Sequence, residues 1–239
     1  MRLTIERVLP YNRGHLVKRE NRKRAGADQV SEFTTGRLSI YLRCLDHLAA
    51  SGVRTVSSQS LAGQFRLNAA QIRKDLAWFG EFGVRGVGYS VAGLAAHLRQ
   101  ILGVGEPINV GVIGAGNLGQ ALADYPGFPR YGFFPVALFD RASAKVGTTS
   151  RGGVPIFHVR RLASVGRKQA IRIAMIAVPA AAAQQAAGLA VDAGIQAILN
   201  FAPGTVTVPA GGKVKNVDLT ISLEGLAFHL ANTVHGQTT

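Results

Sequence analysis

The sequence is short of acidic residues, has a single cysteine and lacks long apolar runs. Its 239 residues hold 13 Asp and Glu against 27 Lys and Arg, which gives a formal net charge of +14. Such an imbalance favours a polyanionic partner, either nucleic acid or an anionic membrane, although the solvated charges of an arginine-rich composition are a plainer alternative. Cys44 cannot form an intrachain disulfide, and its apolar neighbours in a helical pattern place it in the core.

Several kinds of protein are excluded by other absences. No apolar run reaches about 18 residues, so no membrane-spanning helix is expected. The N-terminus lacks the apolar stretch of a signal peptide, which makes the cytoplasm the expected location. His158, His229 and His235 lie near no carboxylate or nucleophile pattern, and no His/Cys group has the spacing of metal ligands. We therefore expect neither a catalytic residue nor a metal centre.

The chain divides into four parts by composition. Residues 1–34 contain the charge run "KRENRKRAGAD" without apolar periodicity, which indicates a solvated basic arm. Contact of this arm with DNA phosphates and an incorrectly assigned start site both remain open. Residues 35–104 are expected to form a small helical domain, residues 105–221 an α/β domain, and residues 222–239 a closing helix and tail.

The helical domain has recognisable helix starts. Leucines in "RLSIYLRCLDHLAASG" recur at helical spacing, and Gly52 ends the pattern. Ser57 or Ser58 is expected to cap a short helix in "SSQSLAGQF", and Asn68 to cap "AAQIRKDLAWF" with Gln71 at capping-box spacing. The inward-facing side chains of that last helix are expected to be Ile72, Leu76 and Phe79. The side chains expected to point elsewhere are Gln71, Lys74, Asp75 and Trp78, with Arg73 at the border.

A glycine-rich stretch, "FGEFGVRGVGY", follows these helices. Helix, tight turn, helix and an extended glycine-rich loop are typical of a winged helix-turn-helix, whose second helix enters the major groove. In such a groove Gln71 can bind adenine and Arg73 or Lys74 can bind guanine or phosphate, while Arg85 can enter the minor groove. A three-helix dimerisation module with a flexible hairpin is the alternative. The residues predicted to bind DNA are Ser57, Ser58, Gln71, Arg73, Lys74, Arg85 and Gly86.

The α/β domain alternates apolar strands with helices, from "INVGVI" and "NLGQALAD" to "IQAILNF" and "KVKNVDL". This alternation predicts a parallel sheet covered on both faces. The expected fold is therefore an α/β chain with an N-terminal winged helix-turn-helix and a Rossmann-like parallel-sheet domain.

A dinucleotide motif, G-x-G-x-x-G, follows the first strand and opens a helix at Gly114, Gly116 and Gly119. The first glycine permits the tight turn, the second lets the backbone approach a pyrophosphate, and the third lets the helix pack against the strand. Asp140 ends the second strand, where a carboxylate binds the adenosine ribose of NAD(H) and repels a 2′-phosphate, whereas the adjacent Arg141 can attract that phosphate. The residues predicted to bind the cofactor are Gly114, Ala115, Gly116, Asn117, Leu118, Gly119, Asp140, Arg141, Val178, Pro179, Asn200 and Phe201.

Little chain remains for a substrate domain once the dinucleotide fold is complete. We therefore expect NADH and NAD⁺ to act as regulatory ligands that are bound without turnover. Three alternatives stay open: an NAD(P)-dependent oxidoreductase with an appended helical domain, a coenzyme A-binding module, and a Rossmann-like fold whose nucleotide site is degraded. Selectivity for NAD(H) is favoured over NADP(H).

Six segments together resemble the Rex family of redox-sensing transcriptional repressors. They are "RLSIYLRCLDHLA", "VSSQSLA", "AAQIRKDLAWFGEFGVRGVGYSV", "GVIGAGNLGQALADYPGF", "ILNFAP" and "NVDLTISLEGLAFHL". The resemblance extends from about residue 36 to residue 230 and implies a cytoplasmic homodimer that binds palindromic operator DNA and leaves it when NADH binds, with no membrane or metal partner. It also implies that the C-terminal helix is exchanged between subunits, and that Arg43, Tyr89 and Asp218 link the two domains across the dimer.

The sequence departs from the family pattern at several positions. Arg141 and Ala142 stand where an acid and a proline are usual after "FD", which leaves the selectivity between NAD(H) and NADP(H) open. Gly204 follows "NFAP" where an apolar residue is usual, so the shape of the nicotinamide pocket can differ. Val84 in the wing and Trp78 after the recognition helix also differ from the usual residues.

Overall fold

The computed structural model describes residues 31–84 and 86–235, and it divides the chain into two compact units after Gly105. The division falls one residue beyond the boundary expected from composition. Nearly all of the expected basic arm, and Arg85 in the glycine-rich stretch, lie outside the described residues.

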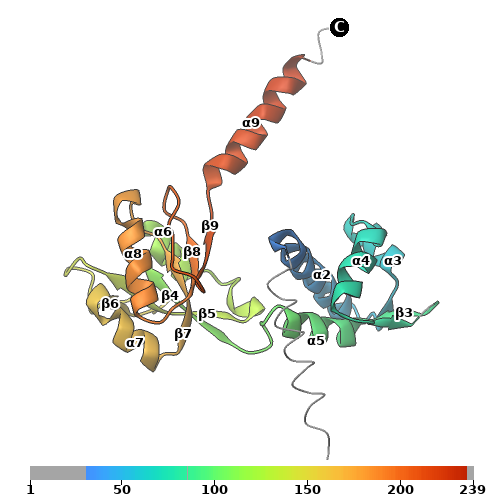
Figure 1. The fold of residues 1–239 in the computed structure, drawn as a ribbon, viewed down its shortest axis with the longest axis horizontal. Helices are drawn as coiled ribbons and strands as arrows, with labels where there is room; N and C mark the ends of the chain where they lie inside the picture. The colour runs from blue at the N-terminus through green and yellow to red at the C-terminus, as the bar shows by residue number, and fades with distance from the viewer. Residues whose placement is uncertain (1–30, 85, 236–239) are drawn as a thin grey trace, which may run out of the picture. The chain divides into compact units, whose positions relative to one another are not determined.

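The N-terminal unit contains four helices and a small sheet in its described part (Figure 1). The helices are α2 (Glu32–Ala50), α3 (Ser58–Phe65), α4 (Ala69–Phe79) and α5 (Val91–Ile101). The strands β1 (Thr55–Val56), β2 (Gly83–Val84) and β3 (Gly88–Ser90) form an antiparallel sheet in the order β1-β3-β2. Helix α3, the short turn and α4 form the helix-turn-helix, and β2 with β3 forms the wing.

Helix α2 begins five residues earlier than its apolar pattern suggests. The Ser31 hydroxyl accepts a hydrogen bond from the Thr34 backbone N–H and caps the helix, and Glu32 lies in its first turn. An acidic residue there is favourable because the N-terminal end of a helix carries partial positive charge. Residues 32–34 therefore belong to α2 and not to the basic arm. The core of this unit includes Leu38, Cys44, Leu45, Leu61, Ile72, Leu94 and Leu98.

The C-terminal unit is built on a six-stranded parallel sheet. Its strands are β4 (Ile108–Ile113), β5 (Phe133–Asp140), β6 (Ile156–His158), β7 (Ile171–Ile176), β8 (Ala197–Asn200) and β9 (Lys213–Asn216). They lie in the order β6-β5-β4-β7-β8-β9, so the chain starts in the middle, runs to one edge, and returns to build the other half. This order is that of a doubly wound dinucleotide-binding sheet, with its switch point between β4 and β7.

Both faces of the sheet are covered, because strand residues alternate between two cores. Phe139 and Ile176 face one core, which they share with α7 (Leu162–Lys168) and α8 (Ala180–Asp192). Leu138 and Met175 face the opposite core, together with α6 (Asn117–Ala123). The Rossmann-like fold expected from the alternation of strands and helices is confirmed. Two 3-10 helices, Pro129–Tyr131 and Val159–Arg161, complete the unit.

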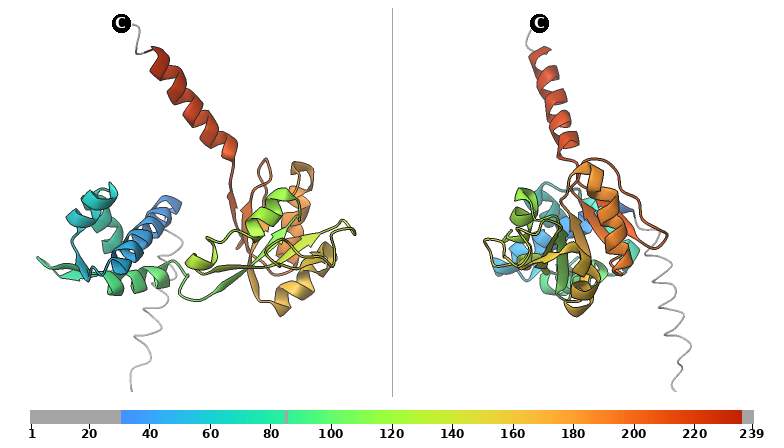
Figure 2. Two further views of the ribbon diagram at one scale, coloured as in Figure 1. Left: turned by 180° about the vertical axis from the view of Figure 1, so that it is seen from behind. Right: turned by 90° about the vertical axis from the view of Figure 1, so that its left-hand side faces the viewer.

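The final helix, α9 (Leu219–His235), begins before the predicted residue 222 and leads away from β9 (Figures 1 and 2). Its large apolar side chains are between 62% and 70% exposed. They are Leu219, Ile221, Leu223, Leu226, Phe228 and Leu230. Despite this apolar character, no helix among the described residues is long and apolar enough to cross a membrane.

Candidate nucleotide and DNA sites

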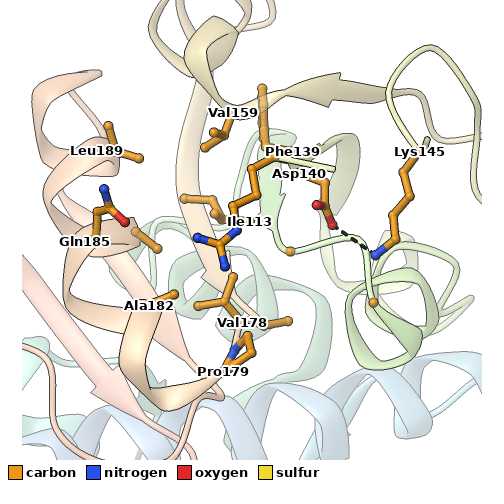
Figure 3. A pocket seen from close by; sticks show the side chains of 15 residues that line it. Ile113, Phe139, Asp140, Lys145, Val159, Val178, Pro179, Ala182, Gln185 and Leu189 are labelled. Atoms are coloured by element: carbon orange, nitrogen blue, oxygen red, sulfur yellow. Dashed lines mark hydrogen bonds and ion pairs between the residues drawn. The ribbon is translucent and has the colours of Figure 1, made fainter. Parts of the chain in front are cut away.

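A pocket of about 330 Å³ lies at the carboxyl ends of the central strands of the C-terminal unit. Ile113 ends β4, Phe139 and Asp140 end β5, and Val178 and Pro179 follow β7 (Figure 3). Doubly wound sheets bind their ligands at this place, because the loops diverge where the strand order reverses. The volume falls within the range of small-molecule sites.

The three motif glycines hold a tight loop at the mouth of this pocket. Gly114 has φ +104°, and a Cβ there would lie 2.4 Å from the Ala177 carbonyl oxygen. A Cβ at Gly119 would lie 1.8 Å from the Gly114 carbonyl oxygen, so the start of α6 can approach the loop only without a side chain. Gly116 differs, because a Cβ there would meet no atom within 4 Å. Gly116 thus leaves space beside the pocket, which fits a group bound against the bare backbone.

Asp140 joins the two loops that border the pocket. Its carboxylate accepts hydrogen bonds from the backbone N–H groups of Ala115 and Ala142, both at 2.9 Å, and from Lys145 Nζ at 3.2 Å. Burial acts to raise the pKa of Asp140, but these donors outweigh it and the pKa lies below its ordinary value. The carboxylate is therefore charged near neutral pH and retains acceptor capacity toward a ribose hydroxyl.

The predicted cofactor residues divide into two groups. Those that line the pocket are Gly114, Gly116, Asp140, Arg141, Val178 and Pro179. Ala115 contributes its N–H to Asp140, while Asn117, Leu118, Gly119 and Phe201 do not line the pocket.

Asn200 does not reach the pocket either. It is fully buried, and its side chain donates to the Ala202 and Gly204 carbonyls and to Asn216 Oδ1. Asn200 therefore shapes the "NFAP" turn after β8, and a contact with a cofactor remains a prediction.

Sequence reasoning missed two polar residues of the pocket. Lys145 lies five residues beyond Asp140 and pairs with it (Figure 3). Gln185 faces the pocket from α8, one turn before Leu189 (Figure 3). A glutamine within an alanine-rich helix was the available signal for Gln185. Nothing in the local sequence indicated that Lys145 pairs with Asp140.

Five of the predicted DNA-binding residues lie on the helix-turn-helix of the N-terminal unit or cap its first helix, while Arg85 lies outside the described residues. Ser57 caps α3, with its hydroxyl accepting from the Ser60 N–H at 3.0 Å. Arg73 Nη1 on α4 donates to the Ser58 hydroxyl at 2.9 Å, so these two residues form one polar surface between the helices. Lys74, the next residue of α4, is exposed, and Gly86 in the wing turn adopts φ +84°.

Two expectations about α4 are wrong. Asp75 does not point away from the core: it is 4% exposed and binds Arg37 and Tyr41 of α2. The capping box is only half formed, because Asn68 Oδ1 accepts from the Gln71 N–H whereas the Gln71 side chain donates to Asp75 instead. In a full capping box the Gln71 oxygen would accept from the Asn68 N–H, but the amide donates to the charged carboxylate one turn further along the helix, which is a strong acceptor.

The three residues expected to link the domains belong to different units. Arg43 is exposed on α2, and the ring of Tyr89 on β3 packs against Gly83 of the wing, where a Cβ would lie 2.9 Å from the ring. Asp218 precedes α9 and accepts from the Thr220 hydroxyl and N–H, and these hydrogen bonds hold its pKa below the ordinary value. Their mutual contact stays a prediction. Within the described residues, no cluster of three or more His, Cys, Asp or Glu is suited to a metal ion.

Known protein families match parts of both units of this chain. Residues 105–204 match the family model of a CoA binding domain, and residues 29–77 match that of a putative DNA-binding protein N-terminus. The redox-sensing transcriptional repressor Rex of Syntrophobacter fumaroxidans is 46% identical over 85% of this chain and 97% of its own length. The protein of the same name from Streptomyces coelicolor is 42% identical over 84% of this chain and 77% of its length.

Solved structures with the same fold include two of RSP. One, in complex with β-NAD⁺ and operator DNA, is 36% identical with a TM-score of 0.79, and the match covers 88% of this chain and 99% of RSP. The other, in complex with β-NADH, is 35% identical with a TM-score of 0.75, covering 87% and 97%. These likenesses extend over both units, and the chain belongs to the Rex family of redox-sensing transcriptional repressors.

Proposed function

We propose that this chain is a transcriptional repressor that senses the ratio of NADH to NAD⁺. It binds operator DNA through its winged helix and is released when NADH occupies the pocket at the switch point. One observation carries the proposal: a helix-turn-helix and a dinucleotide pocket lie on one chain whose relative RSP is solved both with NAD⁺ and operator DNA and with NADH. The protein is not an enzyme, and NADH and NAD⁺ are its regulatory ligands.

The proposed cofactor contacts follow from the pocket. The pyrophosphate lies against the backbone of Gly114 and Gly116, where Gly116 leaves room for it. The adenosine ribose hydroxyls bind Asp140, and we therefore expect a preference for NAD(H), since a 2′-phosphate would approach a carboxylate. Arg141 and Lys145 lie beside Asp140 and act in the opposite direction, so the preference is expected to be moderate.

The proposed DNA contacts follow from the helix-turn-helix. Helix α4 enters the major groove with Gln71, Arg73 and Lys74 in its first two turns. The wing approaches the minor groove with Arg85 and Gly86. Ser57 and Ser58 at the start of α3 bind phosphates.

The proposed coupling requires two copies of the chain. A homodimer places two α4 helices on a palindromic site, and the exposed apolar side chains of α9 are suited to burial against a second copy. Arg43 and Tyr89 of the DNA-binding unit and Asp218 of the nucleotide unit then form the link between the two functions. NADH must favour the state that cannot bind DNA, with a coupling of about 1–3 kcal/mol, as is typical of such systems.

A mobility-shift experiment tests the proposal. The operator is first obtained by selecting bound duplexes from a randomised library with the purified chain. Shifts on that duplex are then titrated in parallel with NADH, NAD⁺, NADPH, NADP⁺ and coenzyme A. We expect release by NADH at the lowest concentration and retention with NAD⁺. Selection of no duplex would contradict the repressor function, and release by none of the five would contradict the sensor function alone.

A further inference from the structure

The recognition helix, α4, carries a buried carboxylate, that of Asp75, which none of the proposed DNA contacts uses. Asp75 of α4 receives the Arg37 guanidinium as a fork, with Nε at 2.6 Å from Oδ2 and Nη2 at 2.8 Å from Oδ1. The Tyr41 hydroxyl donates to Oδ2 at 2.9 Å. Two-point binding by an arginine fixes the plane of a carboxylate as well as its position. The carboxylate of Asp75 is thus held rigidly against α2.

The fourth donor to this carboxylate is a residue proposed to read DNA. Gln71 Nε2 donates to Asp75 Oδ1 at 2.7 Å. The hydrogen bond from Arg37, the largest influence, holds the pKa of Asp75 below its ordinary value, so the group is charged and can only accept. An amide has a donor end and an acceptor end, and only its NH₂ can face a charged carboxylate. The Gln71 carbonyl oxygen therefore points away from Asp75.

We infer that Asp75, held by Arg37 and Tyr41, is a positioning residue for operator recognition that orients the Gln71 amide with its oxygen toward the major groove. The inference rests on the proposed DNA binding. Asp75 takes one of the two N–H donors of the amide, so the oxygen and the second N–H stay available to a base, with the oxygen fixed on the side away from Asp75. Gln71 acts as an acceptor for an exocyclic amino group, which adenine and cytosine both present in the major groove and which guanine and thymine lack there.

A purely structural role for the cluster makes a different prediction. Arg37 and Tyr41 lie on α2, so the cluster also joins α2 to α4. If joining the helices were its whole role, weakening Asp75 would reduce affinity for all duplexes alike. Orientation of Gln71 instead predicts a change confined to one base position.

A double-mutant cycle separates the two roles. Binding constants for Asp75→Asn, Gln71→Ala and the double variant are measured on the selected duplex, on its single-base variants and on an unrelated duplex. We expect each single variant to lose about tenfold on the selected duplex, the cost of one base contact, with discrimination relaxed at the same position. Binding to the unrelated duplex should be unchanged, and Asp75→Asn should add no loss to Gln71→Ala.

A matched control exists in the same unit. Asp46 pairs with Arg99 at 2.5 Å between α2 and α5, so Asp46→Asn weakens a second, more exposed contact between helices of the same unit away from α4. It should leave discrimination between bases intact. A second variant, Arg37→Lys, replaces the two-point hold on Asp75 with a single donor, so it should relax discrimination at the base position of Gln71 and leave binding to the unrelated duplex unchanged.

Three results would overturn the inference. One is additive losses in the cycle, another is an equal loss on all duplexes, and the third is full discrimination at that base position in Arg37→Lys. If Asp75→Asn does not fold, as judged by circular dichroism, Arg37→Lys alone decides the question. If the wild-type chain selects no duplex at all, the proposed function fails first, which distinguishes the two failures.

Discussion

At the scale of single residues, the three glycines of the nucleotide loop have different roles. Gly114 and Gly119 permit the loop to fold, since a side chain at either would overlap a backbone carbonyl oxygen. Gly116 has no such neighbour, so its lack of a side chain has consequences only when a ligand is bound. The same motif therefore contains a folding requirement and a binding requirement, which substitutions can separate.

Gly116→Ala should cost the fold less than about 1 kcal/mol, because Gly116 is the N-cap of α6, and should reduce NADH affinity by at least about tenfold, because its methyl group occupies the space of the pyrophosphate. Gly119→Ala should instead destabilise the nucleotide unit by about 3 kcal/mol, since its Cβ overlaps backbone. Denaturant unfolding and calorimetry with NADH measure the two effects. Gly188→Ala on α8, where a Cβ meets nothing within 4 Å, is the control and should stabilise by about 0.5–1 kcal/mol. If Gly116→Ala bound NADH normally, the pyrophosphate would not lie against this loop.

At the scale of elements, helix α4 combines a buried face with a basic exposed one. Ile72, Asp75 and Leu76 are buried, and Lys74 points to solvent from the same turns. A lysine in this place is suited to a phosphate contact, which carries no information on base sequence.

Lys74→Ala should weaken binding to all duplexes by a similar factor and lower the slope of log affinity against log salt by about 1. The measurement is fluorescence anisotropy at several salt concentrations. Lys168→Ala on α7 of the other unit is the matched control and should leave the slope unchanged. A loss restricted to one base position would assign Lys74 to base recognition.

Helix α9 is apolar over much of its surface and exposed throughout its described side chains. Leu226→Glu places a charge among these apolar side chains, so we expect it to shift the chain from dimer toward monomer in sedimentation and to abolish binding to a two-fold symmetric operator. Glu224→Gln, on the same helix, should sediment as the wild type. A dimer of Leu226→Glu with wild-type stability would place the subunit interface elsewhere.

The sequence predicted long elements with strong periodicity and missed those that depend on distant partners. Strands β4, β5 and β7 were predicted because they read as apolar runs. Helix α7 escaped prediction because no motif marks its start, unlike that of the equally short α6, and it is stabilised by packing against α8. Strand β1 has two residues and exists only by pairing with β3. The burial of Asp75 depends on Arg37, 38 residues earlier, which no local pattern encodes.

At the scale of the whole molecule, a sensor of this kind must couple NADH binding to release from DNA, and a substitution should be able to remove the coupling without removing either binding activity. Asp218 is the residue best placed to separate them, because it lies outside the pocket and at the start of α9. The Thr220 N–H bond shows that it also caps that helix, so Asp218→Ala removes the cap as well as the charge and is compared with a variant that keeps the capping acceptor.

Asp218→Ala should weaken NADH-driven release from DNA more than it weakens NADH binding, with the half-maximal NADH concentration for release rising by up to about tenfold. Asp218→Asn keeps the capping acceptor without the charge and should show the same defect if the charge matters for coupling. Calorimetry gives the binding and mobility shifts give the release. Equal loss of both would assign Asp218 to the cofactor pocket and not to the coupling.

The central claim is that the chain responds to the ratio of the two nucleotides. The direct measurement is the fraction of operator bound as NADH replaces NAD⁺ at a constant total concentration. Binding should fall steeply as the ratio rises, and the midpoint should stay at the same ratio when the total concentration is changed at saturating levels, since both ligands compete for one site. Operator binding that does not change with the ratio, or that falls with NAD⁺ as much as with NADH, would contradict the account.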